Sequence, residues 1–257
     1  MTTPRLDEVA AWIADAGRVV ALTGAGMSTD SGIPDFRGPQ GIWTKDPTAE
    51  RKATIDAWRE EPELRRDAWR FRLSVRDVAF EPNDAHQALV DLQRLDRLDL
   101  LVTQNIDGLH QDAGANPARL VEVHGTAREV VCLACGDRQP LGAVLDRVAA
   151  GDEDPDCLDC GGLLKSATIS FGQALVEADM VRAQAAAESS DVFLALGTSL
   201  AVYPVAWLPL LAKRRGARVV IVNGEPTEMD DVADATLVGR LGTLLPSIVD
   251  RVRTRLA

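Results

Sequence analysis

Residues 18–28 read Arg-Val-Val-Ala-Leu-Thr-Gly-Ala-Gly-Met-Ser. The stretch begins with a short apolar run that lacks the alternation of polar and apolar residues seen in strands with one face in water. A strand covered on both faces has this composition, which is usual in a parallel sheet. The glycine-rich turn that follows, between this strand and an expected helix, is typical of α/β folds. The stretch therefore predicts a buried strand of a parallel sheet.

Four further apolar runs have the same character, and helical patterns separate several of them. They lie at residues 98–103, 120–123, 192–196 and 218–222. A chain of 257 residues with 46% hydrophobic composition can bury one sizeable core and a smaller satellite. The predicted fold class is α/β, with a Rossmann-like parallel sheet flanked by helices.

Two segments interrupt this alternation of strands and helices. Residues 38–85 contain three tryptophans among alternating charges and are interpreted as a helical insertion, and residues 127–170 contain all the cysteines. We expect these two insertions to lie side by side as a small second domain. The remaining chain would form the large domain in three pieces, residues 1–37, 86–126 and 171–257.

The overall composition argues against several functional classes. A net charge of -11 and a pI near 4.8 disfavour direct binding to nucleic acid, because a phosphate backbone attracts clustered Lys and Arg. Residues 192–212 carry no charge, but glycine and proline interrupt them, so a buried strand, a loop and a helix are predicted instead of a membrane span. The N-terminus lacks the pattern of a signal peptide, so a cytoplasmic location is expected. The sequence does not indicate an oligomeric state.

All four cysteines lie in two Cys-x-x-Cys pairs, Cys132 with Cys135 and Cys157 with Cys160. Glycine directly follows the second cysteine of each pair, as tight metal-binding turns favour. The spacing predicts a closed tetrahedral zinc site, which would be structural because four thiolates leave no open position for a substrate. Redox-active dithiols are the alternative, but the strand-to-helix setting of thioredoxins is missing. The segment Asp152-Glu153-Asp154-Pro155, between the two pairs, is expected to form a solvated turn.

Polar residues follow two of the expected strands. Asn105 and Asp107 come after the second strand, and His124 follows the third. Ligands of open α/β sheets bind at the carboxyl ends of strands, although a polar connection with Asp107 as a helix cap is an alternative. A histidine at this edge can act as a base near neutrality, since its unperturbed pKa is about 6.5. The other two histidines, in expected helices, are interpreted as packing or network residues.

Taken together, these motifs resemble the sirtuin family, in its bacterial type with a single catalytic core. Residues 24–38, 103–110 and 122–125 match its signatures, and the resemblance extends to residues 197–199 and 223–225. It also includes the order of both insertions and so covers nearly the whole chain. It implies an NAD-dependent protein lysine deacylase, above all a deacetylase, that acts on acyl-lysine proteins or peptides. The products would be nicotinamide, acyl-ADP-ribose and free lysine.

The resemblance also implies roles for individual residues. His124 corresponds to the base that activates a ribose hydroxyl, and Asn105 to the second catalytic residue. Phe171 and Gly172 would flank the acyl-lysine tunnel and bind substrate. The implied NAD contacts are Gly24, Ala25, Gly26, Asp35, Phe36, Arg37, Gln104, Asn105, Ile106, Asp107, Gly197, Thr198, Ser199, Asn223, Gly224 and Glu225.

Departures from the family pattern concern the acyl group. Gln173 and the pair Lys165-Ser166 stand where the family commonly has Glu and Arg-Pro. Sirtuins that prefer acidic acyl groups share a Tyr-x-x-Arg pair, and Trp69-x-x-Arg72 occupies the equivalent region here. Trp69 with Arg72 keeps a spacing that suits a carboxylate, but inward packing of Trp69 in an amphipathic helix explains it equally well. The sequence alone favours acetyl or longer apolar acyl groups.

Two other functions stay open at this stage. A protein mono-ADP-ribosyltransferase would transfer ADP-ribose from the same cofactor to protein. A non-catalytic NAD-binding or zinc-ribbon interaction module is the second, and the intact His124, Asn105 and Asp107 argue against it.

Overall fold

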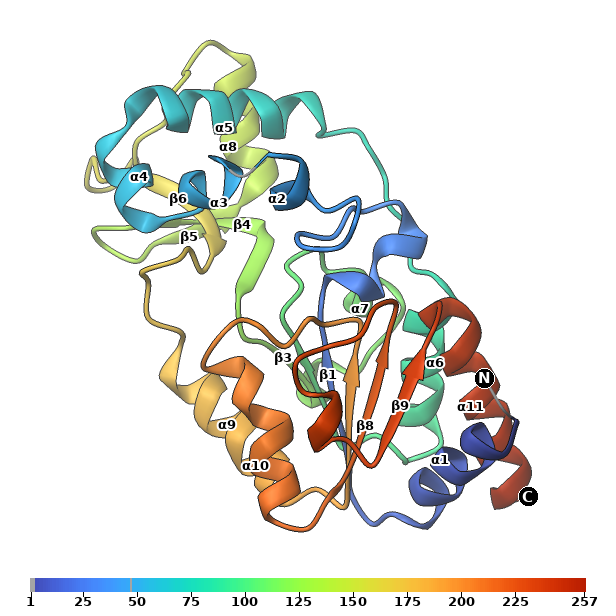
Figure 1. The fold of residues 1–257 in the computed structure, drawn as a ribbon. Helices are drawn as coiled ribbons and strands as arrows, with labels where there is room; N and C mark the ends of the chain where they lie inside the picture. The colour runs from blue at the N-terminus through green and yellow to red at the C-terminus, as the bar shows by residue number, and fades with distance from the viewer. Residues whose placement is uncertain (1–2, 47) are drawn as a thin grey trace.

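A six-stranded parallel sheet forms the centre of the larger of two lobes in the computed structural model, which describes residues 3–46 and 48–257 (Figure 1). The strand order is β3-β2-β1-β7-β8-β9, the order of a Rossmann fold, so the predicted fold class is confirmed. The strands are β1 (Val19–Thr23), β2 (Leu100–Thr103), β3 (Leu120–Glu122), β7 (Val192–Leu196), β8 (Arg218–Asn223) and β9 (Ala235–Val238).

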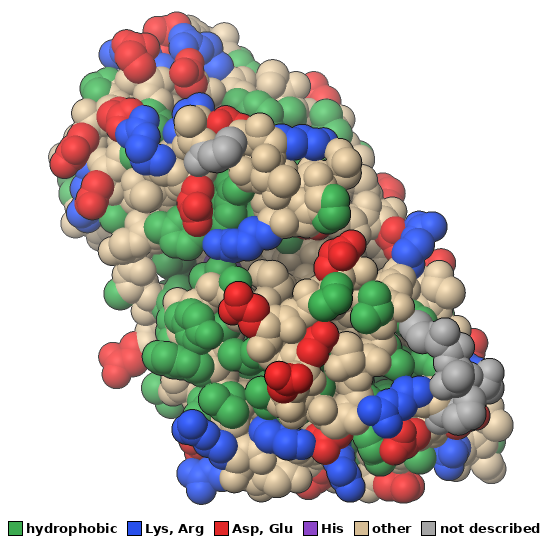
Figure 2. All heavy atoms as spheres, in the orientation of Figure 1, with side chains coloured by type: hydrophobic (Ala, Val, Ile, Leu, Met, Phe, Trp, Pro, Cys, Tyr) green, Lys and Arg blue, Asp and Glu red, His purple; other side chains and the backbone are tan. Residues whose placement is uncertain are grey.

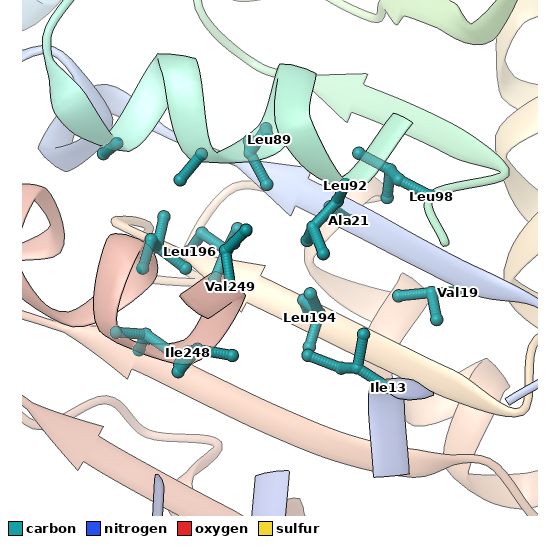
Figure 3. Close-up of a cluster of buried hydrophobic side chains, with 14 of the residues drawn as sticks. Ile13, Val19, Ala21, Leu89, Leu92, Leu98, Leu194, Leu196, Ile248 and Val249 are labelled. Carbon is teal, nitrogen blue, oxygen red and sulfur yellow. The ribbon is translucent and has the colours of Figure 1, made fainter. Parts of the chain in front are cut away.

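Both faces of this sheet are buried, which explains the apolar runs. On β1, Val19 and Ala21 belong to one hydrophobic cluster, whereas Val20 and Leu22 belong to another on the opposite face. Figure 3 shows the first cluster, where side chains of the sheet meet Ile13 of α1, Leu89 of α6 and Val249 of α11. The covering helices are α1 (Thr3–Asp15), α6 (Asp84–Arg94) and α11 (Leu241–Leu256) on this face, and α9 (Glu177–Glu188) and α10 (Leu208–Arg214) on the other.

The five predicted strands are present with ends that differ by at most two residues, but β9 was not expected. Its residues alternate between buried positions, Ala235 and Leu237, and less buried ones, Thr236 and Val238, so β9 lacks the continuous apolar run by which the other strands were predicted. The uncharged residues 192–212 form β7, a loop and the start of α10. None of the helices in the described part of the chain combines the length and the apolar composition needed to cross a bilayer.

The smaller lobe contains the two insertions, which share one hydrophobic cluster. Trp58 and Trp69 from the first insertion pack with Val130, Val144 and Leu164 from the second. The first insertion forms α2 (Ile42–Lys45), α3 (Thr48–Lys52), α4 (Ile55–Glu60) and α5 (Pro62–Ser74). The second forms the antiparallel sheet β5-β4-β6 and one helix, with bounds β4 (Gly125–Cys132), β5 (Arg138–Pro140), α8 (Leu141–Ala149) and β6 (Leu164–Thr168).

Short helices complete the described chain. One of them, α7 (Leu109–Asp112), follows the polar loop after β2. The 3₁₀ helices are η1 (Ala25–Met27), η2 (Thr29–Ser31), η3 (Pro117–Arg119), η4 (Val205–Trp207) and η5 (Asp230–Val232).

The acidic residues 152–155 do not form the fully solvated turn that the sequence predicted. Asp154 instead accepts from Nε and Nη2 of Arg65 at 2.8–3.0 Å, and both side chains are largely buried. Nη1 of Arg65 donates to the carbonyl oxygen of Trp58 at 2.9 Å. This bidentate ion pair joins the helical insertion to the cysteine-containing insertion.

We expect Arg65→Ala to lower the free energy of unfolding by about 2–3 kcal/mol, because it leaves Asp154 largely buried without its cation. Urea titration measures this loss. The matched control is Arg66→Ala, which removes the neighbouring exposed pair with Glu63 and should cost less than about 0.5 kcal/mol. Equal losses in the two variants would contradict the role of the buried ion pair.

Candidate active site

A cavity of about 1830 Å³ opens between the two lobes, lined by residues at the carboxyl ends of the large sheet (Figure 2). Every NAD-contact, catalytic and substrate residue that the sequence predicted lines it, and only the four cysteines lie elsewhere. The strands bring these residues together because the ends of neighbouring parallel strands meet at one edge of a sheet.

The glycine loop after β1 packs directly against the loop after β7. A Cβ atom on Gly24 would lie 2.7 Å from Cβ of Thr198, and one on Gly26 would lie 2.9 Å from Cα of Gly197. The amide of Gly26 donates to the carbonyl oxygen of Gly197 at 2.8 Å. The close contact between the two loops therefore requires glycine at positions 24 and 26. Short 3₁₀ turns follow β1 at the place where the sequence predicted a helix.

The loop after β2 is held by the buried Ser28, which was not among the site residues predicted from the sequence. Oγ of Ser28 donates to Oδ2 of Asp107 at 2.7 Å and accepts from Nδ2 of Asn105 at 3.1 Å. Oδ1 of Asp107 accepts from the amide of Leu109 at 2.9 Å. Gln104 donates to Oγ1 of Thr198 at 2.9 Å. These bonds fix the amide of Asn105 and the carboxylate of Asp107 before any ligand binds.

His124 follows β3 with one ring nitrogen held by the protein. Nδ1 lies 3.1 Å from the carbonyl oxygen of Gln104. A carbonyl oxygen can only accept, so Nδ1 carries the proton and Nε2 has a free lone pair. Burial lowers the pKa of His124, and the bond to Gln104 opposes this shift. The imidazole is therefore neutral near pH 7 and its Nε2 atom can accept a proton.

Aromatic rings connect the loop of residues 35–38 to Phe171, which lies three residues after the end of β6. The ring centroids of Phe36 and Trp43 lie 4.8 Å apart, and those of Trp43 and Phe171 lie 5.6 Å apart. The guanidinium of Arg37 lies 4.3 Å from the centroid of Trp43. Phe171 also exchanges backbone hydrogen bonds with residues 53 and 55 of the helical insertion. The loop of residues 35–38 and Phe171 therefore share one aromatic wall of the cavity.

Residues after β7, β8 and β9 complete the cavity. Asn223 donates to the carbonyl oxygen of Glu225 at 2.7 Å, which closes the turn of residues 223–225. Gly239 and Arg240 also line the wall, but they were not predicted as site residues because β9 was not expected. The two remaining histidines, His86 and His110, are fully buried beside the loop after β2, with ring centroids 4.9 Å apart.

The four cysteines form a separate cluster in the small lobe. Their Sγ atoms all lie within 4.8 Å of one another, with 3.5 Å between Cys132 and Cys160 and 3.8 Å between Cys135 and Cys157. Tetrahedral zinc with Zn–S bonds of about 2.3 Å places its sulfur ligands about 3.8 Å apart. A Cβ atom on Gly162 would lie 2.9 Å from Sγ of Cys132, which is too close, so glycine is needed beside this sulfur. The donor set and its spacing fit one zinc ion with a closed coordination shell.

Comparison with known proteins identifies the family of this arrangement. The model of the Sir2 family matches residues 24–204. The NAD-dependent protein deacetylase 2 of Streptomyces coelicolor is 47% identical over 231 residues, which cover 90% of this chain and 96% of that protein. The similarity therefore includes both lobes and the cavity between them.

Solved structures agree over the full length. One from work on the mechanism and regulation of Sir2 enzymes has a TM-score of 0.88 at 36% identity and covers 100% of both chains. A Sir2 enzyme with deacetylated p53 peptide and 3′-O-acetyl ADP-ribose has a TM-score of 0.87 at 32% identity and covers 96% of this chain and 98% of its own. The chain belongs to the Sir2 family.

Proposed function

We propose that this chain is an NAD-dependent protein lysine deacylase in which His124 is the general base. The observation that carries the proposal is that His124 has a free Nε2 lone pair and lines the same cavity as Asn105 and Asp107. The zinc ion of the four cysteines stabilises the small lobe and takes no part in the chemistry, because its coordination shell is closed.

NAD, when bound, supplies a ribose carbon that accepts the acyl oxygen and a nicotinamide that leaves. Asn105 and Asp107 are fixed by Ser28, so their dipole and charge can stabilise developing positive charge on the ribose without reorganising. Nε2 of His124 takes a proton from a ribose hydroxyl, and the carbonyl oxygen of Gln104 stabilises the resulting imidazolium through Nδ1.

Different loops of the cavity bind different parts of NAD and of the substrate. Gly24 and Gly26 use their amides for bonds within the protein, whereas the amide of Ala25 has no acceptor among the described residues and is available to donate to a phosphate of NAD. Phe36 and Arg37 cover the cofactor from the small-lobe side, and the loops after β7 and β8 hold the adenosine half. Phe171 and Gly172 flank the acyl-lysine.

We also propose the domain division predicted from the sequence, with NAD bound by the large domain. Two of the four predicted boundaries, 85/86 and 126/127, fall within two residues of the start of an element, because α6 begins at Asp84 and β4 at Gly125. Acyl-lysine segments of proteins are the proposed partners, and the peptide complex of the related Sir2 enzyme supports this.

The deciding experiment incubates the zinc-loaded protein with NAD and an acetyl-lysine peptide, and follows both nicotinamide and peptide mass. We expect nicotinamide release that depends on the acyl peptide, with loss of the acetyl group from lysine. Transfer of ADP-ribose to protein, with the acetyl group retained, would identify a mono-ADP-ribosyltransferase instead. A protein that bound NAD without consuming it would be a non-catalytic module.

A further inference from the structure

We propose that Arg128 of β4 is a positioning residue that holds the loop after β2 in the geometry in which Asn105 and Asp107 stabilise the ribose of NAD as nicotinamide leaves. The inference rests on the proposed deacylase function, because that function gives Asn105 and Asp107 their roles. Arg128 is not among the residues that line the cavity, so it acts on the reaction only through the loop.

The loop after β2 is bound on two sides. Ser28 of the large lobe holds the side chains of this loop, and the start of β4 holds its backbone. The amide of Ala127 donates to the carbonyl oxygen of Ile106 at 2.9 Å. Nε and Nη2 of Arg128 each lie 3.4 Å from the carbonyl oxygen of Asp107, to which both donate. Two successive carbonyl oxygens of the loop are therefore bonded to a strand of the small-lobe sheet.

The guanidinium of Arg128 packs directly against the backbone of Gly108. A Cβ atom on Gly108 would collide with Nε and Cζ of Arg128. Gly108 also has a φ of +77°, in the left-handed region that favours glycine. The guanidinium thus occupies the space that a side chain at position 108 would fill, and the arginine and the loop form one packed unit.

A carboxylate from the same loop region fixes the guanidinium. Nη2 of Arg128 donates to Oδ2 of Asp112, the last residue of α7. The first residue of α7, Leu109, donates its amide to Oδ1 of Asp107 at 2.9 Å. The side chain of Asp107 therefore holds the start of α7, and Arg128 joins the end of α7 to the carbonyl oxygen of Asp107. A planar guanidinium with five N–H donors can bond to two such acceptors at once.

The bonds of Arg128 fix the peptide group that follows Asp107. Within the described residues, Arg128 provides the only side chain that donates to the carbonyl oxygen of Asp107, and no backbone amide donates to it. Without Arg128, this peptide group can rotate and turn the carboxylate of Asp107 with it. Groups that stabilise a transition state must be oriented beforehand, and a misplacement of about 1 Å can cost about 100-fold in rate.

Global stability depends little on the pair of Arg128 and Asp112. Their side chains are 45% and 42% exposed, and ion pairs with this exposure add little to the stability of a fold. The chain also offers a matched control in Arg138 of β5, which pairs with Glu129 of β4 at 2.6 Å and has similar exposure. Neither residue of the control pair lines the cavity. A change in the reaction without a change in folding therefore separates positioning from a structural role.

The first test measures two rates of the zinc-loaded protein with NAD and an acetyl-lysine peptide. One is deacetylation, and the other is the exchange of labelled nicotinamide into NAD, which needs cleavage of the nicotinamide–ribose bond but no proton transfer to His124. In Arg128→Ala, both rates should fall about tenfold, with the KM for the peptide unchanged. The double variant with Asp112→Ala should lose no more than Arg128→Ala, because the two groups act as a unit. Arg138→Ala should match the wild type.

The second test detects the position of the loop without the reaction. Hydrogen exchange of the free protein, followed by mass spectrometry, reports how firmly each segment is held. In Arg128→Ala, the amides of residues 108–112 should exchange about tenfold faster, whereas the other segments and the melting temperature should match the wild type. Arg138→Ala should leave the exchange of residues 108–112 unchanged.

Each outcome has a distinct meaning. Normal deacetylation and normal nicotinamide exchange in Arg128→Ala would overturn the positioning role and leave the deacylase function standing. A loss of rate together with a lower melting temperature and faster hydrogen exchange throughout the chain would also overturn it, because Arg128 would then support the whole fold. A wild-type protein that releases no nicotinamide would overturn the proposed function itself, and hydrogen exchange would then decide whether Arg128 orders the loop.

Discussion

Replacing His124 by alanine is expected to lower the turnover of an acetyl-lysine peptide by about 10²- to 10⁴-fold, the usual contribution of a positioned general base. The structure supports this size of effect because Nε2 of His124 has its lone pair free and Nδ1 is fixed by Gln104. Appearance of the deacetylated peptide, followed by mass spectrometry, measures the loss.

Folding should be unaffected by the His124 substitution. The imidazole is half-buried at the cavity wall and makes one described hydrogen bond, so its removal costs little stability. Melting temperature and bound zinc should match the wild type. If His124→Ala kept more than about a tenth of the normal turnover, another group would have to act as the base.

Removing the zinc ion is expected to unfold much of the small lobe and abolish turnover. Structural zinc in zinc-finger peptides contributes about 10–16 kcal/mol of apparent binding free energy, which exceeds the stability of most domains. Cys132 and Cys157 lie within the hydrophobic cluster that Trp58 and Trp69 also form. Loss of the ion therefore also disturbs the helical insertion, which binds Phe171 through its backbone.

The zinc measurement combines chelation with substitution. Treatment with a strong chelator and the variant Cys135→Ser should both reduce bound zinc, lower the melting temperature and reduce deacetylation at least about 100-fold. Added zinc should restore the chelated wild type but not the variant. An apo protein with unchanged melting and turnover would show that the cysteines do not support the fold through a metal.

Local patterns in the sequence predicted several features well. The apolar runs located five of the six large-sheet strands, and the spacing of the cysteine pairs predicted their cluster. Both signals are local, because the burial of a strand and the turn between two close ligands depend on neighbouring residues. Strand β9 was missed because its residues alternate between buried and less buried positions and so lack a continuous apolar run.

The tertiary structure alone decided which distant side chains meet. Ser28 contacts Asp107 across 79 positions, and Arg72 contacts Ser166 across 94 positions. In the sequence, Lys165 was only a departure from a family pattern, and Trp69-x-x-Arg72 had two interpretations. The sequence by itself thus determined the strands, the metal ligands and the family signatures, which depend on local composition and spacing. Only the folded chain brought a lysine of β6 beside an arginine of α5, because contacts between distant segments depend on the topology that packs the two insertions together.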